Sequence, residues 1–517
     1  MKKALLATAF LEGLSVLIVE IAGARALAPY FGSSLHVWTA QITATLLFLA
    51  LGYGVGGWFS RRPAAWKLPA VFWGAGCWLG LYPFLRNSIL GATATHFGVA
   101  GGSFLASALL FGVPLGCLGA VSPLIISRLD ALQSGAGSAA GQLFLVNTLG
   151  GLAGGWLTAL VLIPHLPLRL ALAGTGVLLA CLGGLWGLTL RRKAAAPVAP
   201  LITLLLLGLA PHPPDTLLFA GTPARVVHRQ QSGVGLIQVL EAEGPDQPAY
   251  RALLIDGVTQ GGMDLATGLS AYEFSAYLND LAWRYHPQAR SALLLGLGSG
   301  VLGKELASRG LAVSAAEIEP RIEVASRRWF GLPDSVRVIR EDARSYLNRD
   351  NRDGATYDLI FLDVFAGENV PWYLVTREAL HAVQRHLNPG GRLLVNWVTR
   401  QDGESDGLRR LEAGMAGAFG EAKVFVDSSE SGPLVNAILV AGKDLVMQKA
   451  PFPGRVVDPI VPKLAAMEAR ERPARLNPPN TLIGSDDFSD LDDAEADLRL
   501  EWRKLVVATM GPEVLAD

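Results

Sequence analysis

Six long apolar segments fill the first 210 residues, and this feature limits the fold more than any other. They cover residues 4–27, 37–58, 68–85, 103–126, 141–163 and 168–190. A helix needs about 20 apolar residues to cross the ~30 Å hydrocarbon core of a bilayer, and each segment is that long or nearly so. The chain is 51% hydrophobic and 17% charged, against about 25% charged in a typical soluble protein, and the deficit lies in this half. We therefore predict a multi-pass α-helical membrane domain of six to seven helices over residues 1–210.

Basic residues occur at alternate connections between these segments. Cytoplasmic loops of membrane proteins carry an excess of Lys and Arg. The cytoplasmic side is therefore predicted from Lys2, Lys3, Arg61, Arg62, Lys67, Arg128, Arg191, Arg192 and Lys193. Residues 194–210 form a seventh, shorter apolar segment that contains Pro197 and Pro200. We interpret it as re-entrant or interfacial, which keeps the following half in the cytoplasm at the cell membrane; the alternative is that one of the six spans is miscounted.

The first segment contains the charged residues Glu12, Glu20 and Arg25. Charges at membrane depth are costly and normally face a cavity or a partner. Glu12 and Glu20 are eight residues apart, which places both near one helix face. One interpretation is a Glu20–Arg25 pair, and the other is a polar path for a cationic metabolite, to which Asn147 would contribute. The sequence leaves the role of both acids open.

Residues 211–517 have the composition of an ordinary enzyme. The net charge of the chain is -1, so nothing favours binding to nucleic acid. The three cysteines, Cys77, Cys117 and Cys181, all lie in apolar stretches. This placement argues against disulfides and against a thiolate metal site, and the eight histidines form no recognisable zinc set. We therefore expect no metal and no tightly bound cofactor.

A glycine-rich loop follows the apolar run Ala292–Leu295. Glycines at 296, 298 and 300 let backbone approach a ligand closely, and a helix-compatible segment follows from Val301. The predicted strands 312–316, 336–340 and 357–362 end next to Glu317, Asp342 and Asp363. Ligands in open α/β sheets bind at this edge, and an acid after the second strand suits a ribose diol. The pattern predicts a nucleoside site of the S-adenosylmethionine type; a dinucleotide site or a degenerate Rossmann sheet is the alternative.

The remaining patterns divide the C-terminal half. Residues 211–222 are Pro-rich and predict a linker. Strand-like runs at 224–230, 235–241 and 250–255 predict a small antiparallel β subdomain, which together with a connecting helix occupies residues 223–290. Residues 291–443 are predicted to form a Rossmann-like, class I methyltransferase-like catalytic domain, followed by a C-terminal tail, 444–517. Asn388–Gly391 is predicted as a turn, and Asn396 and Trp397 follow it close enough to reach the site.

Ordered motifs in residues 224–443 resemble those of spermidine synthases, a family of polyamine aminopropyltransferases. They are Leu254-Ile-Asp-Gly-Val-Thr-Gln260, Tyr272-Glu273, Gly296-Leu-Gly-Ser-Gly300, Glu317-Ile-Glu-Pro320, Glu341-Asp-Ala343 and Tyr357-Asp-Leu-Ile-Phe-Leu-Asp363. The first half, most of all residues 28–38, resembles the spans of membrane-fused members. The resemblance implies transfer of an aminopropyl group from decarboxylated S-adenosylmethionine to a diamine, with release of methylthioadenosine.

The same resemblance implies roles for individual residues. Asp363 would be the catalytic base and Tyr272 would line the amine pocket. Gln260 and Glu317 would contact the nucleoside, with Glu317 on the ribose. The remaining nucleoside contacts would come from Gly296, Gly298, Ser299, Gly300, Asp342 and Ala343, with Asp342 on the adenine amino group. The implied partners are small molecules and the lipid bilayer, and a homodimer is compatible with the sequence.

Two positions depart from the family pattern. Ser299 and Ala366 stand where spermidine synthases place carboxylates that hold primary ammonium groups, and Glu368 could substitute for the second of these. The departures favour two alternatives. One is an enzyme that acts on S-adenosylmethionine itself, by internal cyclisation, elimination or methyl transfer. The other is a non-catalytic, transporter-like protein that senses a nucleoside.

Overall fold

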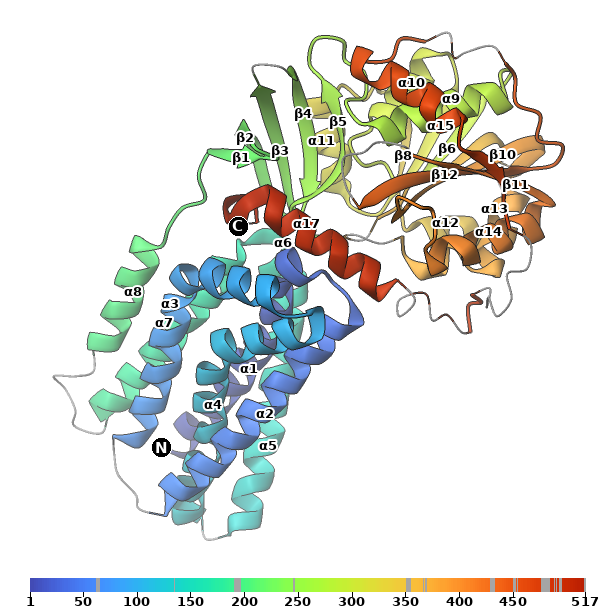
Figure 1. The fold of residues 1–517 in the computed structure, drawn as a ribbon. Coiled ribbons are helices and arrows are strands. Elements are labelled where there is room, and N and C mark those ends of the chain that lie inside the picture. Colours follow the sequence, from blue (N-terminus) through green and yellow to red (C-terminus); the bar gives the residue numbers. More distant parts are fainter. Residues whose placement is uncertain are drawn as a thin grey trace. The chain divides into compact units, whose positions relative to one another are not determined.

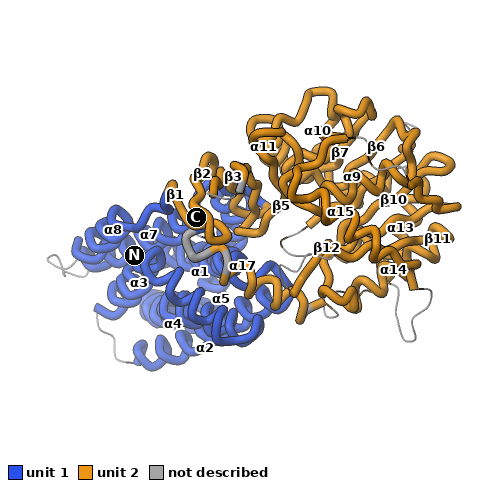
Figure 2. Tube along the Cα trace, turned by 45° about the horizontal axis from the view of Figure 1, so that its top comes forward, with its two compact units in different colours: residues 1–214, 231–233, 511–517 blue, residues 215–230, 234–510 orange. Residues whose placement is uncertain are grey.

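The computed structural model describes the chain except for residues 62–65, 134, 190–196, 245–246, 350–354, 366, 368–369, 428–432, 450–451, 453, 476–483, 488, 490, 492–494 and 516–517. It divides into two compact units, which Figure 2 distinguishes by colour. One contains residues 1–214, 231–233 and 511–517, and the other contains residues 215–230 and 234–510. Each unit is described by itself.

The first unit is a bundle of long apolar helices (Figure 1), of which six are long and apolar enough to cross a membrane. They are α1 (Lys2–Phe31), α2 (Leu35–Ser60), α3 (Lys67–His96), α4 (Val99–Gln133), α5 (Ala136–Leu157) and α7 (Leu168–Thr189). A π-helical turn (Thr158–Leu162) and the short helix α6 (Ile163–His165) continue α5 and count as part of the same span. This agrees with the six predicted segments. The seventh segment contains α8 (Val198–Leu209), a helix of 12 residues. At 1.5 Å per residue it is about 18 Å long, which is shorter than the hydrocarbon core.

Small residues let these helices approach closely, as expected for membrane bundles. α5 packs on α1, and a Cβ at Gly150 or Gly154 would overlap the backbone of Phe10 or Leu14. Glu12 of α1 is 2% exposed and accepts a hydrogen bond from the Asn147 side chain of α5. Glu12, the buried acid of α1, is thus paired with the predicted Asn147.

The second unit contains two sheets. An antiparallel sheet has the strand order β1-β2-β3-β4-β5. Its strands are β1 (Thr216–Phe219), β2 (Thr222–Gln231), β3 (Leu236–Gly244), β4 (Gln247–Ile255) and β5 (Val258–Asp264). Three of these strands, β2, β3 and β4, were expected. Strand β1 lies inside the segment predicted as a linker. Strand β5 follows a tight turn at Asp256 and Gly257. Helix α9 (Glu273–Tyr285) then leads into the larger sheet.

The larger sheet has the order β13-β11-β12-β10-β9-β6-β7-β8. Its strands are β6 (Ser291–Leu295), β7 (Ala312–Glu317), β8 (Arg337–Arg340), β9 (Tyr357–Leu362), β10 (Leu387–Arg400), β11 (Glu421–Val426), β12 (Leu434–Gly442) and β13 (Glu471–Pro473). Strands β8, β7, β6, β9 and β10 are parallel, and β12, β11 and β13 pair antiparallel. The order reverses between β6 and β9, so a crevice opens at their carboxyl ends. This Rossmann-like, methyltransferase-like fold agrees with the predicted class.

Helices cover both faces of the larger sheet (Figure 1). One buried cluster joins the sheet to α9, α10 (Val301–Ser308) and α11 (Pro320–Phe330), and the other joins it to α12 (Ala343–Asn348), α13 (Arg377–Arg385) and α14 (Asp406–Phe419). Trp397 is 4% exposed and belongs to the second cluster. The residues predicted as a turn, 388–391, are assigned to β10, but they have no partner in β9: the pairing stops after Leu387 and resumes at Arg392. Gly390, within this break, has a positive φ.

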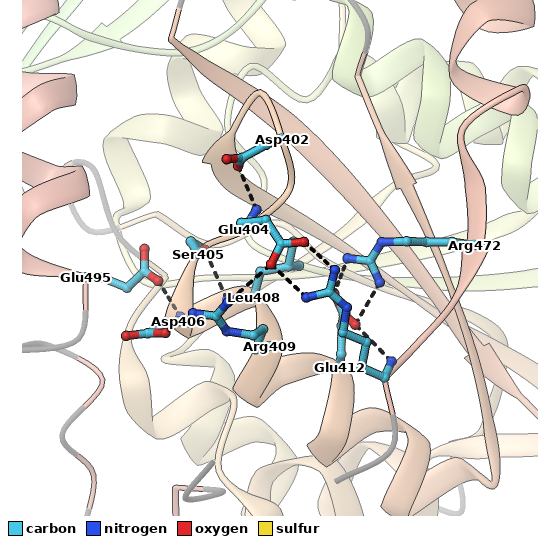
Figure 3. Close-up of polar contacts among 11 residues, drawn as sticks. Asp402, Glu404, Ser405, Asp406, Leu408, Arg409, Glu412, Arg472 and Glu495 are labelled. Carbon is cyan, nitrogen blue, oxygen red and sulfur yellow. Dashed lines mark hydrogen bonds and ion pairs between the residues drawn. The ribbon is translucent and has the colours of Figure 1, made fainter. Parts of the chain in front are cut away.

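An ion-pair network joins the C-terminal segment to α14 (Figure 3). Glu412 has no exposed side-chain area. It accepts hydrogen bonds from the Arg472 guanidinium at 2.5 and 2.9 Å and from the Arg475 backbone N–H at 2.9 Å. The Glu404 carboxylate pairs with Arg475 and Arg409, and hydrogen bonds from Arg475 lower the pKa of Glu404 to about 2. β13 is therefore held at the sheet edge by charge as well as by pairing.

The rest of the tail contains a short 3-10 turn at Asp458–Ile460, α15 (Val461–Glu468) and the helix α17 (Ala496–Val514). A further 3-10 turn, Trp372–Leu374, lies between β9 and α13. Glu495, just before α17, accepts a hydrogen bond from the Gly407 N–H at the start of α14. Leu491 and Leu498 are 4% and 5% exposed. The first turns of α17 are thus attached to the rest of the second unit.

Candidate active site

A cavity of about 290 Å³ lies at the carboxyl ends of β6, β7, β9 and β10. Its lining includes six of the predicted site residues, namely Gln260, Tyr272, Gly296, Gly298, Glu317 and Asp363. These come from both sheets of the second unit. The tertiary structure therefore brings together residues that are up to 103 positions apart in the chain.

The glycine-rich loop forms one wall of the cavity because its backbone is packed on two sides. Gly296 has a φ of 89°, and a Cβ there would lie 2.5 Å from the Asp363 carbonyl oxygen. Gly298 has a φ of 53°, and a Cβ there would lie 2.6 Å from the Gln260 carbonyl oxygen. A residue with a side chain would be strained in φ and would collide at both positions. Glycine is thus required for the loop to fit between β5 and β9.

Glu317 ties the glycine-rich loop to the end of β7. Its carboxylate accepts hydrogen bonds from the Leu297 N–H at 3.1 Å and from the Glu319 N–H at 2.8 Å. Burial raises the pKa of Glu317. A carboxylate has about four lone-pair sites, so the two backbone bonds leave acceptor capacity for a ligand. Its place beside the loop agrees with the predicted position for a ribose contact.

Asp363 follows β9 at the point where the sheet order reverses. Its Oδ1 accepts a hydrogen bond from Asn396 Nδ2 at 2.9 Å, and Asn396 Oδ1 accepts one from Asn436 Nδ2 at 2.8 Å. Burial raises the pKa of the Asp363 carboxyl to about 6, and the hydrogen bond from Asn396 opposes this rise. Asn396 is 2% exposed, so the aspartate is held by a buried amide that is itself bonded to Asn436. The sequence analysis noted Asn396 but missed Asn436. The only sequence signal for Asn436 is that it is a polar residue within the otherwise apolar strand β12.

Tyr272 and Gln260 contribute from the side of the small sheet. Tyr272 immediately precedes α9, and its ring lies 6.2 Å from that of Phe274 between centroids. Burial raises the pKa of its phenol, so the hydroxyl stays protonated. The Gln260 side chain donates a hydrogen bond to the Val258 carbonyl at 3.3 Å. Both can offer neutral polar groups to a ligand.

Four predicted residues do not line the cavity. Ser299 is 6% exposed, and its hydroxyl faces Gly261 of β5, where a Cβ would lie 2.7 Å from Ser299 Oγ. Gly300 immediately precedes α10. Asp342 caps α12 by accepting a hydrogen bond from the Ser345 N–H at 2.9 Å, and Ala343 is buried in the core. Their ligand contacts stay predictions, and Glu368 and Ala366 lie outside the described residues.

Sequence reasoning missed most of the apolar lining. Beside Asp363 the cavity is lined by Val364, Phe365, Val398, Leu434, Trp502 and Leu505. Trp502 and Leu505 come from α17, in the segment predicted only as a tail, and Trp502 meets Phe365 edge-on at 6.2 Å between centroids. No local pattern connects positions 365 and 502. Among the described lining residues, Glu317 and Asp363 are the only carboxylates.

Comparison with known proteins finds polyamine aminopropyltransferases among the sequence relatives. No protein-family model matches the chain. It is 33% identical over 155 residues to a polyamine aminopropyltransferase of Vibrio vulnificus, which covers 29% of this chain and 50% of that protein. It is 26% identical over 179 residues to a probable polyamine aminopropyl transferase of Bifidobacterium longum, which covers 32% of this chain and 40% of that protein. The chain thus spans half or less of the length of these relatives.

A probable spermidine synthase from Corynebacterium glutamicum aligns with a TM-score of 0.38 and 20% identity, covering 50% of this chain and 96% of that chain. The sequence relatives share the name implied by the motifs around Gly296, Glu317 and Asp363. Over the part that these relatives match, the chain is similar to polyamine aminopropyltransferases.

Proposed function

We propose that the protein is a membrane-bound aminopropyltransferase. It transfers the aminopropyl group of decarboxylated S-adenosylmethionine to an amine and releases methylthioadenosine. The observation that carries this proposal is the cavity shared by Glu317 and Asp363, which lie at the carboxyl ends of β7 and β9 on either side of β6. The named activity of the relatives, polyamine aminopropyl transfer, supports it.

The proposed reaction is an in-line displacement. The amine nitrogen attacks the methylene carbon next to the donor sulfonium, so an N–C bond forms as the C–S bond breaks. The electron pair of the broken bond goes to sulfur, which leaves as the neutral thioether of methylthioadenosine. The proton lost by the amine goes to the Asp363 carboxylate, which acts as general base. The donor is a co-substrate, and alignment of the two reactants supplies most of the acceleration.

Neighbouring residues have supporting roles in this proposal. Glu317 accepts from the ribose hydroxyls beside the glycine-rich loop, and Gln260 contacts the nucleoside. Tyr272 stays neutral and offers its hydroxyl to the amine. Asn396 holds Asp363 so that the carboxylate faces the attacking nitrogen. The catalytic unit would work at the cytoplasmic face, as the basic residues flanking the apolar segments indicate.

The purified full-length protein, incubated with decarboxylated S-adenosylmethionine and an amine, should form methylthioadenosine. Asp363→Asn should abolish this turnover and leave binding of methylthioadenosine almost unchanged, because the amide keeps the shape but cannot accept the proton. Calorimetry with methylthioadenosine separates the two effects. Loss of binding parallel to loss of rate would contradict the role of Asp363 as base.

The same incubations distinguish the alternatives. Within the described lining, Glu317 and Asp363 are the only carboxylates that could bind the ammonium group of decarboxylated S-adenosylmethionine. Intact S-adenosylmethionine should therefore be tested as donor as well. Methylthioadenosine without an acceptor would indicate an internal reaction, and adenosylhomocysteine would indicate methyl transfer. Tight binding without turnover of either donor would indicate a nucleoside sensor.

A further inference from the structure

The order of the larger sheet separates the two substrates of the proposed displacement. Glu317, the proposed ribose acceptor, ends β7, and Asp363 follows β9, with β6 between them. Strands β10 and β12 lie on the other side of β9. In an in-line displacement the attacking nitrogen approaches opposite the leaving sulfur, so the two reactants lie on opposite sides of the reacting carbon. With the nucleoside on the β7 side of Asp363, the amine therefore approaches from the side of β10 and β12.

One face of α17 completes the cavity wall on this amine side. Leu498, Trp502 and Leu505 are four and three residues apart, which places them on one face of the helix. Trp502 and Leu505 line the cavity. The Trp502 ring meets the Phe365 ring edge-on, at 6.2 Å between centroids and an interplanar angle of 68°. Because Phe365 follows Asp363 by two residues and lines the same cavity, this aromatic pair lies next to the proposed base.

The same face of α17 is seated on the sheet by contacts of its own. Leu498 is 5% exposed, and it borders, with Trp397 of β10, a gap of only about 20 Å³. Glu495, just before α17, accepts a hydrogen bond from the Gly407 N–H at 2.5 Å. Gly407 is at the start of α14, where a helix N-terminus favours a carboxylate. These contacts hold α17 against β10, so Trp502 is part of a packed wall.

The strands on the amine side present aliphatic side chains to the cavity. Val398 lies two residues after Asn396 on β10, and Leu434 is the first residue of β12. Both line the cavity together with Trp502. An amine whose nitrogen is at Asp363 therefore has its carbon atoms beside aromatic and aliphatic groups. Burial of those carbon atoms against apolar side chains is favourable.

We propose that Trp502 is a specificity-determining residue for the acceptor, and that the carbon chain of the amine packs against its ring. This inference rests on the proposed aminopropyl transfer and assigns a residue of the C-terminal helix to its acceptor side. The edge-on contact with Phe365 restricts the Trp502 ring to a defined position. The ring therefore stabilises a bound alkyl chain and limits the length of chain that fits between it and Asp363.

The test measures the acceptor and donor constants separately on the full-length protein in lipid nanodiscs. Putrescine is the probe amine, decarboxylated S-adenosylmethionine is the donor, and release of methylthioadenosine is the readout. Trp502→Ala should raise KM for putrescine at least about 10-fold, because the amine loses a large apolar contact. KM for the donor and Kd for methylthioadenosine should stay almost unchanged, since the nucleoside lies on the β7 side. Trp502→Phe keeps an aromatic ring and should recover most of the loss.

A change in size preference separates contact with the amine from a purely structural role. Cadaverine is one methylene longer than putrescine. Trp502→Ala should raise the ratio of kcat/KM for cadaverine to that for putrescine about 10-fold, because the vacated space accepts the extra methylene. Leu505→Ala should shift this ratio in the same direction. Glu501→Gln, on the same helix with a half-exposed side chain, is the matched control and should behave as the wild type.

Two results in Trp502→Ala would overturn the assignment. One is an unchanged KM for putrescine, and the other is an equal rise in the donor and amine constants. If Trp502→Ala does not bind methylthioadenosine, Leu505→Ala is judged by the same criteria. If the wild type releases no methylthioadenosine with either amine, the proposed function fails. Calorimetry with putrescine on protein saturated with methylthioadenosine then decides the assignment: weaker binding to Trp502→Ala supports it, and equal binding or none to either protein overturns it.

Discussion

Replacing Asn396 by alanine tests the buried amide that holds Asp363. The substitution removes the 2.9 Å hydrogen bond to the carboxylate, which opposes the rise in its pKa. A hydrogen bond to a charged group contributes about 1.5–3 kcal/mol, and 1.36 kcal/mol corresponds to one pH unit. The pKa of Asp363 should therefore rise from about 6 by about 1 to 2 pH units in the variant.

The sign of the effect follows from the role of Asp363 as a base. The carboxylate must be ionised, so the wild-type rate should fall as the pH drops through about 6. In Asn396→Ala the fall should begin at a higher pH, so that the rate at pH 7 decreases roughly 2- to 10-fold and recovers by about pH 9.

The measurement is kcat/KM for methylthioadenosine formation between pH 5.5 and 9.5. Asn436→Ala is the matched control, because it removes the 2.8 Å bond to Asn396 and leaves the bond to Asp363 in place; it should move the acid limb less. A loss that is equal at every pH would refute the argument, since it would show that Asn396 acts through packing and not on the charge of Asp363.

Three further predictions concern other parts of the catalytic unit. Glu317→Ala should weaken binding of methylthioadenosine by about 1.5–3 kcal/mol, because a ribose diol loses its charged acceptor. Calorimetry measures this change. Glu323→Ala is the control and should bind methylthioadenosine as the wild type does. Gly298→Ala should also weaken that binding, because a Cβ would lie 2.6 Å from the Gln260 carbonyl oxygen; unchanged affinity would show that the loop can move away from β5. Glu412→Gln should lower the free energy of local unfolding of β13 by about 1–3 kcal/mol, since Arg472 loses a buried charged acceptor. Hydrogen exchange in peptides covering β13 should therefore become roughly 5- to 150-fold faster.

Much of the fold was predictable because its signals are local. The apolar segments, the alternation of the small sheet and the strand–glycine–helix pattern at 292–309 each depend on neighbouring residues, and helices α1 to α7 and strands β6, β7 and β9 lie where these patterns predict. Strand β1 was hidden because it has only four residues beside a Pro-rich stretch. Residues 388–391, predicted as a turn, fall within β10 where its register with β9 is interrupted, and that register depends on the pairing of two strands.

From the residues alone, the site was predictable only where an acidic residue lies at the carboxyl end of a buried strand. Glu317 and Asp363 follow buried strands, so their common edge follows from the parallel order. Asp342 also follows a strand, but its carboxylate caps α12, a local hydrogen bond that competes with any ligand. Ser299 faces Gly261 across two sheets, and no spacing in the sequence indicates that contact.

By itself the sequence determined that this chain has a half made of long apolar helices and a Rossmann-like sheet with acids at its strand ends, because hydrophobic length and strand-end acids are properties of short segments. The tertiary structure alone decided what surrounds Asp363. Asn396 and Asn436 meet through strand pairing, and Trp502 reaches Phe365 through the docking of a helix 137 residues away. Such contacts depend on how helices and strands that are distant in the sequence pack together. The surfaces on which they pack exist only in the folded chain.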